Sequence, residues 1–417
     1  MYKRAATAQL YYSTNNEAVG KRMGYLERQM QRKVNIIFHK LRMAFFPKSV
    51  KRLVLYLMGN GATIDDEIKL QIDRKFDNKM IISTIYACVD GVVWGFPDLN
   101  EEGNPSLTFF RATEFVPLFD ERTSKLMAGI RFWQIAPDKP IYIEFYEING
   151  MTEFKIQNGS ITELEAKRAY KNIVRKDSFS TDILSAENYD ILPIVPLYAN
   201  ELGTSELTTG LKSLIDAYDF ISSDLVDTIT LIEGLYWIIK NFGGENVQQL
   251  LAELQTLKAS LIDGSDTAAD SYTVEAPFQA KQMALDLLEK RMHSDWLMPS
   301  DGITGAARGV TATEIKANRE PLDMKADILE WQVAEFIENI LKLKGLTDLT
   351  VGNFKRRTSS NDTETINNIA TQLSGGWIDE EEAIELDPTI NTERKEDLLK
   401  RIELLNIGAL QNEEDNE

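Results

Sequence analysis

The apolar positions of this chain change their spacing along the sequence, and the change separates regions of different secondary structure. Residues 17–46 mix basic and apolar positions as an amphipathic surface helix does, so they predict a basic helix. Residues 80–156 instead hold short runs rich in β-branched and aromatic residues, separated by turn sequences such as DLNEEGNP, APDKP and NGM. Links of hairpin length between such runs predict a meander of antiparallel strands. The proline-containing segment ILPIVPLY (191–198) is expected to be extended and either buried or at a sheet edge.

From Ser205 onward, apolar residues recur three and four positions apart, which is typical of helices. One stripe spans 206–238, and at ~1.5 Å per residue a single helix there would be roughly 50 Å long. The stripe consists of Leu211, Leu214, Ile215, Tyr218, Ile221, Leu225, Ile229, Ile232 and Tyr236. A second helix is expected over 247–264, followed by a short extended piece at 271–277. A third helix begins at Pro277, with one face formed by Lys281, Leu285, Leu288, Met292 and Trp296.

A loop with one Pro and three Gly occupies 297–310, and a long helix is expected after it. Thr311 and Glu314 have the spacing of a capping box, so the helix should begin there and run to about Leu343. Pro321 removes a backbone donor inside this helix, which predicts a kink. An extended segment then leads to short helices that begin near Asp362, Asp379 and Thr392.

Composition and charge describe a globular, acidic chain. Its length of 417 residues predicts two or three packed units, and its 43% hydrophobic content suffices for a large core. Residues 1–52 carry twelve Lys or Arg and two Glu, a net charge of +10. The net charge of the whole chain is −19, so the remaining residues carry about −29. An acidic body repels nucleic acid, because tight binding needs cations that displace phosphate counterions. No stretch reaches eighteen apolar residues and no secretion signal is evident, so we expect a cytoplasmic protein without a membrane span.

The usual signs of catalysis are missing from the sequence. Cys88 cannot form an intramolecular disulfide and is better interpreted as a buried small residue than as a nucleophile. His39 and His293 are far apart, and GNGATI (59–64) is interpreted as a turn. A phosphate-binding loop, a nucleophile elbow and a zinc-binding helix motif are all absent from the sequence. We therefore predict no catalytic residue, no metal and no cofactor.

One helix carries an unusual row of acids. Asp216, Asp219, Ser223 and Asp227 share a face opposite the apolar stripe, because they are spaced by three, four and four residues. Like charges at this spacing destabilise a helix by a few tenths of a kcal/mol per pair, and no compensating Lys is evident. The row fits a solvated face. It also fits a Mg²⁺ site of a phosphate-handling enzyme, and an external reason for the acids remains open.

The order of these parts resembles the portal proteins of tailed bacteriophages. The most specific match is ILPIVPLYANELGTSELTTGLKSLIDAYDFISSDLVD (191–227), an extended PIVP segment, a polar spacer and an acidic helix. Residues 87–132 look like the family's β-rich wing, and 354–402 are similar to its C-terminal pattern. The sequence departs from the family at RGVTATEIK (308–316), where relatives often have Ser-Gly before the kinked helix, and its segment between the two stem helices is short.

This resemblance implies an α+β portal fold and a set of domain boundaries. Its parts would be a β-rich wing, a helical stem, a small α/β clip, a long kinked helix and a mostly helical crown. Carried over by position, these are wing 1–204, first stem helix 205–240, clip 241–276, second stem helix 277–297, tunnel loop 298–310, kinked wing helix 311–344 and crown 345–417.

The resemblance also implies a function. Family members form a ring, usually of twelve copies, at one capsid vertex of the virion, through which double-stranded DNA is packaged and ejected. The expected partners are other copies of the chain, the major capsid protein, the terminase motor and the neck or adaptor proteins. DNA would pass without sequence specificity, and the chain would be made in the host bacterial cytoplasm.

The resemblance assigns roles to particular residues as well. Asp216, Asp219, Ser223 and Asp227 would line the DNA channel and repel its phosphates. The tunnel loop would contain Ser300, Asp301, Gly302, Thr304, Gly305, Arg308 and Gly309, with Pro321 as a hinge beside it. Contacts of the clip with partners would involve Glu245, Gln248, Asp263, Asp266 and Asp270. Two alternatives stay open on the sequence: a metal-dependent phosphate-handling enzyme, and a scaffold whose basic N-terminal helix docks on membranes.

Overall fold

The computed structural model describes most of the chain and divides it into two compact units, residues 1–356 and 357–417. The described residues are 2–30, 38–99, 104–177, 180–232, 236–240, 268–272, 278–299, 312–346, 351–356, 362–387, 390, 394–395 and 398–402. Each unit is a separate body with its own elements. The mixture of helices and antiparallel sheets confirms the predicted α+β class.

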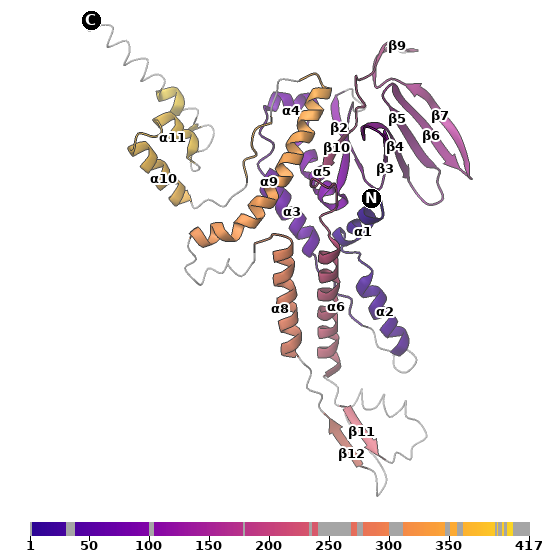
Figure 1. The fold of residues 1–417 in the computed structure, drawn as a ribbon, viewed down its shortest axis with the longest axis vertical. Coiled ribbons are helices and arrows are strands. Elements are labelled where there is room, and N and C mark those ends of the chain that lie inside the picture. The colour runs from indigo at the N-terminus through magenta and orange to yellow at the C-terminus, as the bar shows by residue number, and fades with distance from the viewer. Residues whose placement is uncertain are drawn as a thin grey trace. The chain divides into compact units, whose positions relative to one another are not determined.

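The first unit contains most of the described helices and all of the described strands (Figure 1). Its helices are α1 (Tyr2–Tyr12), α2 (Ala18–Met30), α3 (Phe45–Met58), α4 (Asp66–Ile72), α5 (Phe76–Asp90), α6 (Thr209–Ile232), α8 (Phe278–Asp295) and α9 (Ala312–Leu343). Its strands are β1 (Val92–Leu99), β2 (Pro105–Arg111), β3 (Phe115–Phe119), β4 (Leu126–Gln134), β5 (Ile141–Glu147), β6 (Gly150–Gln157), β7 (Ser160–Arg168), β8 (Lys171–Asp177), β9 (Ser180–Glu187), β10 (Val195–Tyr198), β11 (Tyr236–Lys240) and β12 (Ala268–Tyr272).

The predicted strand meander is present from residue 92 onward. Strands β3 to β7 form a five-stranded antiparallel sheet in sequence order, and β10, β1 and β2 form a three-stranded one. Strand β10 pairs only with β1 in that sheet, with Pro196 opposite Trp94, so the expectation of an extended edge segment at ILPIVPLY is confirmed. The pairs β8–β9 and β11–β12 form separate two-stranded sheets.

The first predicted strand run was wrong over residues 80–90, which belong to helix α5. Its β-branched residues favour a strand, but its buried positions are spaced by three and four residues: Phe76, Met80, Ser83, Thr84, Ala87 and Cys88. The hydroxyls of Ser83 and Thr84 donate to the carbonyl of Met80, which satisfies them inside the helix. Packing against α1, α3 and the strands therefore overrides the local β preference.

The main core lies where α9 packs against α3 and strand β10, and where α5 packs against the same two elements. Leu329, Val333 and Phe336 of α9 are almost fully buried there. A second apolar cluster joins the three-stranded sheet to the five-stranded one through Trp94, Phe110 and other aromatic rings. The same core holds Cys88, as predicted, and burial raises the pKa of its thiol far above the usual range.

Two predicted helices end earlier than expected. The basic helix proposed for 17–46 is present as α2, residues 31–37 lie outside the described residues, and residues 38–44 are not helical before α3 begins at Phe45. The single helix proposed for 206–238 is α6, which ends at Ile232, and Tyr236 already belongs to strand β11. The helix proposed for 247–264 lies outside the described residues.

Helix α9 runs through Pro321 and changes direction along its length, as Figure 1 shows. After it, residues 351–356 pack back on the first unit through Arg356, which forms ion pairs with Asp323 and Asp327 and a 2.9 Å pair with Glu330. The second compact unit therefore begins at 357, twelve residues after the crown boundary inferred from the resemblance.

The second unit contains the short capped helices predicted for the C-terminal region. Helix α10 (Asp362–Ser374) is followed by Gly375 and Gly376, and α11 (Glu380–Leu386) begins after Asp379. The Asp379 carboxylate accepts a hydrogen bond from the Glu382 amide at 2.8 Å, which is the predicted N-cap. Part of the third expected helix is described at 398–402.

Gly95 provides a test of the contact between α9 and strand β1. A Cβ atom at Gly95 would lie 2.6 Å from the ring of Phe336, so Gly95→Ala should lower the free energy of unfolding by about 1–3 kcal/mol. Gly24→Ala is the control, because a Cβ there meets nothing within 4 Å and alanine favours a helix. Urea unfolding of both variants measures the difference, and equal stability of the two would contradict this packing.

Candidate functional site on helix α6

Helix α6 lies beside α8 on one side and beside α2 on another (Figure 1). Lys281 of α8 joins the first pair: its ammonium is 2.8 Å from the Asp224 carboxylate and 2.6 Å from the Thr228 hydroxyl. The expected apolar face of α8 is confirmed at Leu285, Met292 and Trp296, which are buried. Helices α6 and α8 are therefore joined by the ion pair and hydrogen bond of Lys281, and the apolar face of α8 is buried.

The acidic face of α6 does not point to solvent. Asp219 and Ser223 have no exposed surface and Asp227 is 5% exposed. An extended segment, residues 38–44, covers this face, which we call the acidic row (Asp219, Ser223 and Asp227). The interpretation of the row as a solvated face is wrong, because its members accept hydrogen bonds from elsewhere in the same chain.

Alternate backbone amides of the segment donate to successive members of the row. The His39 amide donates to Asp227 at 2.9 Å, the Leu41 amide to the Ser223 hydroxyl at 3.0 Å and the Met43 amide to Asp219 at 2.8 Å. The segment and the helix therefore run in opposite directions. Each step of two residues in the segment matches a step of four residues in the helix.

The match follows from the two backbone repeats. Two residues of an extended chain advance about 6.5 Å, and four residues of an α-helix advance about 6 Å. Acceptors spaced by four on one helix face are therefore in register with amides spaced by two on an extended strand. Backbone amides that pack against another element need acceptors, and the row supplies the oxygens that a neighbouring β-strand would otherwise supply.

The first acid of the predicted channel lining, Asp216, is bound in a different way. It accepts a hydrogen bond from the Tyr11 hydroxyl, and the Lys212 ammonium is 2.9 Å from its other oxygen. The expectation that these acids lack a compensating cation is therefore wrong at Asp216, as it is at Asp224. Tyr11 has its pKa raised to about 12, mainly by burial and then by Asp216.

Side chains of the N-terminal region complete the contact with the row. The Asn16 amide donates to Asp219 at 3.0 Å, and the Arg42 guanidinium donates to the Asn16 carbonyl at 3.0 Å. Apolar residues Val19, Met23 and Phe38 pack with Phe220, and the Arg22 guanidinium lies 3.4 Å from the centre of that ring. Sequence reasoning missed all of these partners.

Burial shapes the electrostatics of the row. It raises the pKa of Asp219, and the donated hydrogen bonds from Asn16 and Met43 oppose that rise without cancelling it. At Asp227, one oxygen is 2.7 Å from a ring nitrogen of His39 and also accepts the His39 amide. The other Asp227 oxygen is buried without a hydrogen-bond partner among the described residues.

This geometry does not fit the metal-site interpretation. The inner oxygens of Asp219 and Asp227 face N–H donors, which occupy the positions that a cation would need. Within the described part of the chain, three His, Cys, Asp or Glu side chains do not come together as a metal-binding group. Likewise, none of the helices in that part is long and apolar enough to cross a membrane.

The remaining predicted site residues are dispersed along the chain. The tunnel-loop residues Ser300, Asp301, Gly302, Thr304, Gly305, Arg308 and Gly309 lie outside the described residues, as do the clip residues Glu245, Gln248, Asp263 and Asp266. Asp270 lies on strand β12, opposite Ile238 of β11. Pro321 lies within α9.

Hydrogen exchange tests the pairing between the segment and the row. Ser223→Ala removes the acceptor of the Leu41 amide, so that amide should exchange up to about tenfold faster, since one such bond is worth about 0.5–1.5 kcal/mol. Ser222→Ala is the matched control on the neighbouring position of α6 and should leave Leu41 unchanged. Equal protection of Leu41 in both variants would show that the segment is held by other contacts.

Comparisons with known proteins identify the family of this chain. The family described as "Phage portal protein, SPP1 Gp6-like" matches residues 1–405. The portal protein of Bacillus phage SPP1 is 22% identical over 419 residues, covering 94% of this chain and 82% of the relative. The portal protein of Clostridium phage phiCD119 is 23% identical over 352 residues, covering 77% and 74%.

Two solved assemblies contain chains of similar length. A chain in the virion of a native gene transfer agent particle is 11% identical, with a TM-score of 0.41, covering 93% of this chain and 94% of the other. A chain in the neck of an empty particle of the same kind is 11% identical, with a TM-score of 0.42 and 94% coverage of both. Because the family match extends over residues 1–405, this chain belongs to the SPP1 Gp6-like family of phage portal proteins.

Proposed function

We propose that this chain is one subunit of a ring at a single capsid vertex, through which double-stranded DNA is packaged and later ejected. The observation that carries this proposal is the family match over residues 1–405. The family is one of structural proteins, and the chain acts as a conduit and a docking platform in the virion. Twelve copies are the number that the resemblance implies.

The hydrogen-bonding of α6 changes how a channel would be lined. Asp219, Ser223 and Asp227 are engaged within the subunit, so they hold the N-terminal segment on the helix and do not repel DNA directly. The position of α6 relative to a channel remains a prediction. Repulsion of phosphate would then come from the charge of the whole chain, which is −19 and becomes more negative outside residues 1–52.

We assign each part of the chain a role within such a ring. The sheets and α9 form the wing, α6 and α8 the stem, and the region around β11 and β12 the clip, which would contact the terminase motor and the neck proteins. The loop at 298–310, with Arg308, would contact DNA, and Pro321 would connect loop movement to the wing. The second unit, residues 357–417, would form the crown.

The two other functions considered from the sequence are not supported. A phosphate-handling enzyme would need several free carboxylates for its metal, and both oxygens of Asp219 and one oxygen of Asp227 already accept hydrogen bonds. A membrane scaffold would need the basic N-terminal region exposed along a single helix. Instead, α2 is short, and Val19 and Met23 on it are buried against the rest of the subunit.

Electron microscopy of the purified chain tests the ring directly. A ring needs a heterologous contact whose rotation closes, so negative-stain images should show closed rings with a central opening wide enough for duplex DNA. Size-exclusion chromatography with light scattering should give one dominant mass that is an integral multiple of 47.3 kDa. Symmetric dimers or open filaments at every protein concentration would contradict the proposal.

A DNA-binding titration tests the conduit. An acidic wall should hold duplex DNA weakly, so binding to assembled rings should be non-specific and no tighter than the roughly 10⁻⁴–10⁻⁶ M typical of non-specific contacts at physiological salt. Fluorescence anisotropy with two unrelated duplexes measures this. Tight binding that depends on sequence would instead assign the chain to the DNA-binding proteins.

A further inference from the structure

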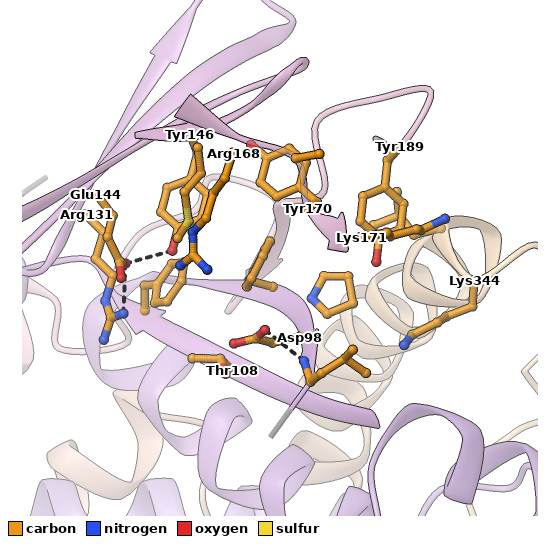
Figure 2. A pocket seen from close by; sticks show the side chains of 17 residues that line it. Asp98, Thr108, Arg131, Glu144, Tyr146, Arg168, Tyr170, Lys171, Tyr189 and Lys344 are labelled. Atoms are coloured by element: carbon orange, nitrogen blue, oxygen red, sulfur yellow. Dashed lines mark hydrogen bonds and ion pairs between the residues drawn. The ribbon is translucent and has the colours of Figure 1, made fainter. Parts of the chain in front are cut away.

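A cavity of about 570 Å³ lies between the two larger sheets and the C-terminal end of α9 (Figure 2). Its volume is in the range of sites that hold a small molecule or a peptide side-chain group. None of the roles proposed above for the wing, stem, clip or crown uses it. Its walls combine aromatic rings with cationic side chains, which is the feature that suggests a ligand.

The aromatic wall is built from several elements of the fold. Phe96 contributes from β1 and Tyr146 from β5, while Tyr170 and Tyr189 come from the chain on either side of the β8–β9 pair. Phe96 lies 5.3 Å from the ring of Tyr146 and 5.9 Å from that of Tyr170, centre to centre. This wall offers a flat apolar surface that a ring or an apolar chain of a ligand could cover.

Two of the four cations in the cavity already have carboxylate partners. Arg131 is 2.9 Å from Glu144, which also accepts a 2.7 Å hydrogen bond from the Tyr146 hydroxyl. Arg168 is 2.8 Å from Glu153. Besides these two paired guanidinium groups, the cavity is lined by two ammonium groups, those of Lys171 and Lys344.

Lys171 and Lys344 approach the cavity from opposite elements, β8 and the residue after α9 (Figure 2). The Lys171 ammonium lies 4.2 Å from the centre of the Tyr189 ring, and the Lys344 ammonium forms no hydrogen bond or ion pair with the described residues. Burial, and then the charge of Lys171, lower the pKa of Lys344, while Asp98, which also lines the cavity, opposes this. An anion between the two lysines would offset their mutual repulsion and accept hydrogen bonds from both ammonium groups.

We propose that this cavity binds an organic carboxylate, with the carboxylate between Lys171 and Lys344 and the apolar body against Tyr170 and Tyr189. Inorganic phosphate would satisfy the two charges but would leave the aromatic wall uncovered. A neutral aromatic molecule would cover the wall but leave the lysines without an acceptor. Both halves of the site are used only when charge and apolar surface belong to one molecule.

Isothermal titration calorimetry of the full chain with phenylacetate tests this proposal. Phenylacetate should bind saturably, and phenylacetamide, its neutral analogue, should bind about tenfold more weakly or worse, since a hydrogen bond to a charged group is worth roughly 1.5–3 kcal/mol. Phosphate should also bind at least about tenfold more weakly, because it buries no apolar surface. Equal binding of phenylacetate and phenylacetamide, or tighter binding of phosphate, would overturn the proposal.

Variants identify the site. Lys344→Met and Lys171→Met, which lie on different elements, should each weaken phenylacetate by about tenfold. Lys342→Met is the matched control, because this exposed lysine lies two residues away on α9 and does not line the cavity. Unchanged affinity in both cavity variants, with thermal unfolding showing that they are folded, would place binding elsewhere.

The natural carrier of the carboxylate can be a partner protein or a free small molecule. An acetylated Phe-Glu dipeptide amide and its Phe-Gln counterpart distinguish these sources. Tighter binding of the Phe-Glu peptide than of phenylacetate, lost in the Phe-Gln peptide, would support the proposal with an acidic segment of a partner as the source. Binding of phenylacetate alone would support it with a free metabolite as the source.

Discussion

The path of residues 38–44 over helix α6 depends on hydrogen bonds that backbone amides donate to side-chain oxygens of that helix. Residues 38–44 are extended, and the amides of His39, Leu41 and Met43 have no strand partner for these bonds. A helix cannot offer its own backbone, because its carbonyls are already used within the helix. Side-chain oxygens at every fourth position of α6 take the role of the missing strand, and this fixes the path of the chain between α2 and α3.

The same contact explains why the acids can lie close together on one helix. In water, carboxylates at this spacing would repel each other and weaken the helix. Here each carboxylate of the row faces N–H donors and is largely removed from solvent, so the repulsion is offset locally. An acceptor removed from this row would leave one of these amides without its hydrogen bond, which makes the row a structural element of the subunit.

Helix α9 and the sheets likewise combine polar and apolar contacts. Helix α9 packs its apolar side against the three-stranded sheet, and its acids hold Arg356 of the returning chain. Beyond the end of α9, the space between the sheets is lined by aromatic rings and by charged groups, of which Arg131 and Arg168 are paired. The region proposed as the wing therefore contains a cavity that the proposed passage of DNA does not use.

The sequence by itself determined the α+β class, the strand meander beyond residue 92, the capped helices of the second unit and the family. These depend on local signals: period-two or three-and-four spacing, turn residues and cap residues such as Asp379. The sequence also marked α6 as unusual, because carboxylates at this spacing repel each other. It could not show which groups bind these carboxylates, since Met43 and Asp219 are 176 residues apart and meet only in the folded chain.

Tertiary structure decided the remaining assignments. Residues 80–90 became helix α5 because their buried side chains fit between α1, α3 and the strands, although their β-branched residues favour a strand. The acids of the row became acceptors for amides of the same chain, because a segment with matching spacing lies on them. Burial and pairing of this kind depend on which distant segments come together, and no local pattern in the sequence specifies that.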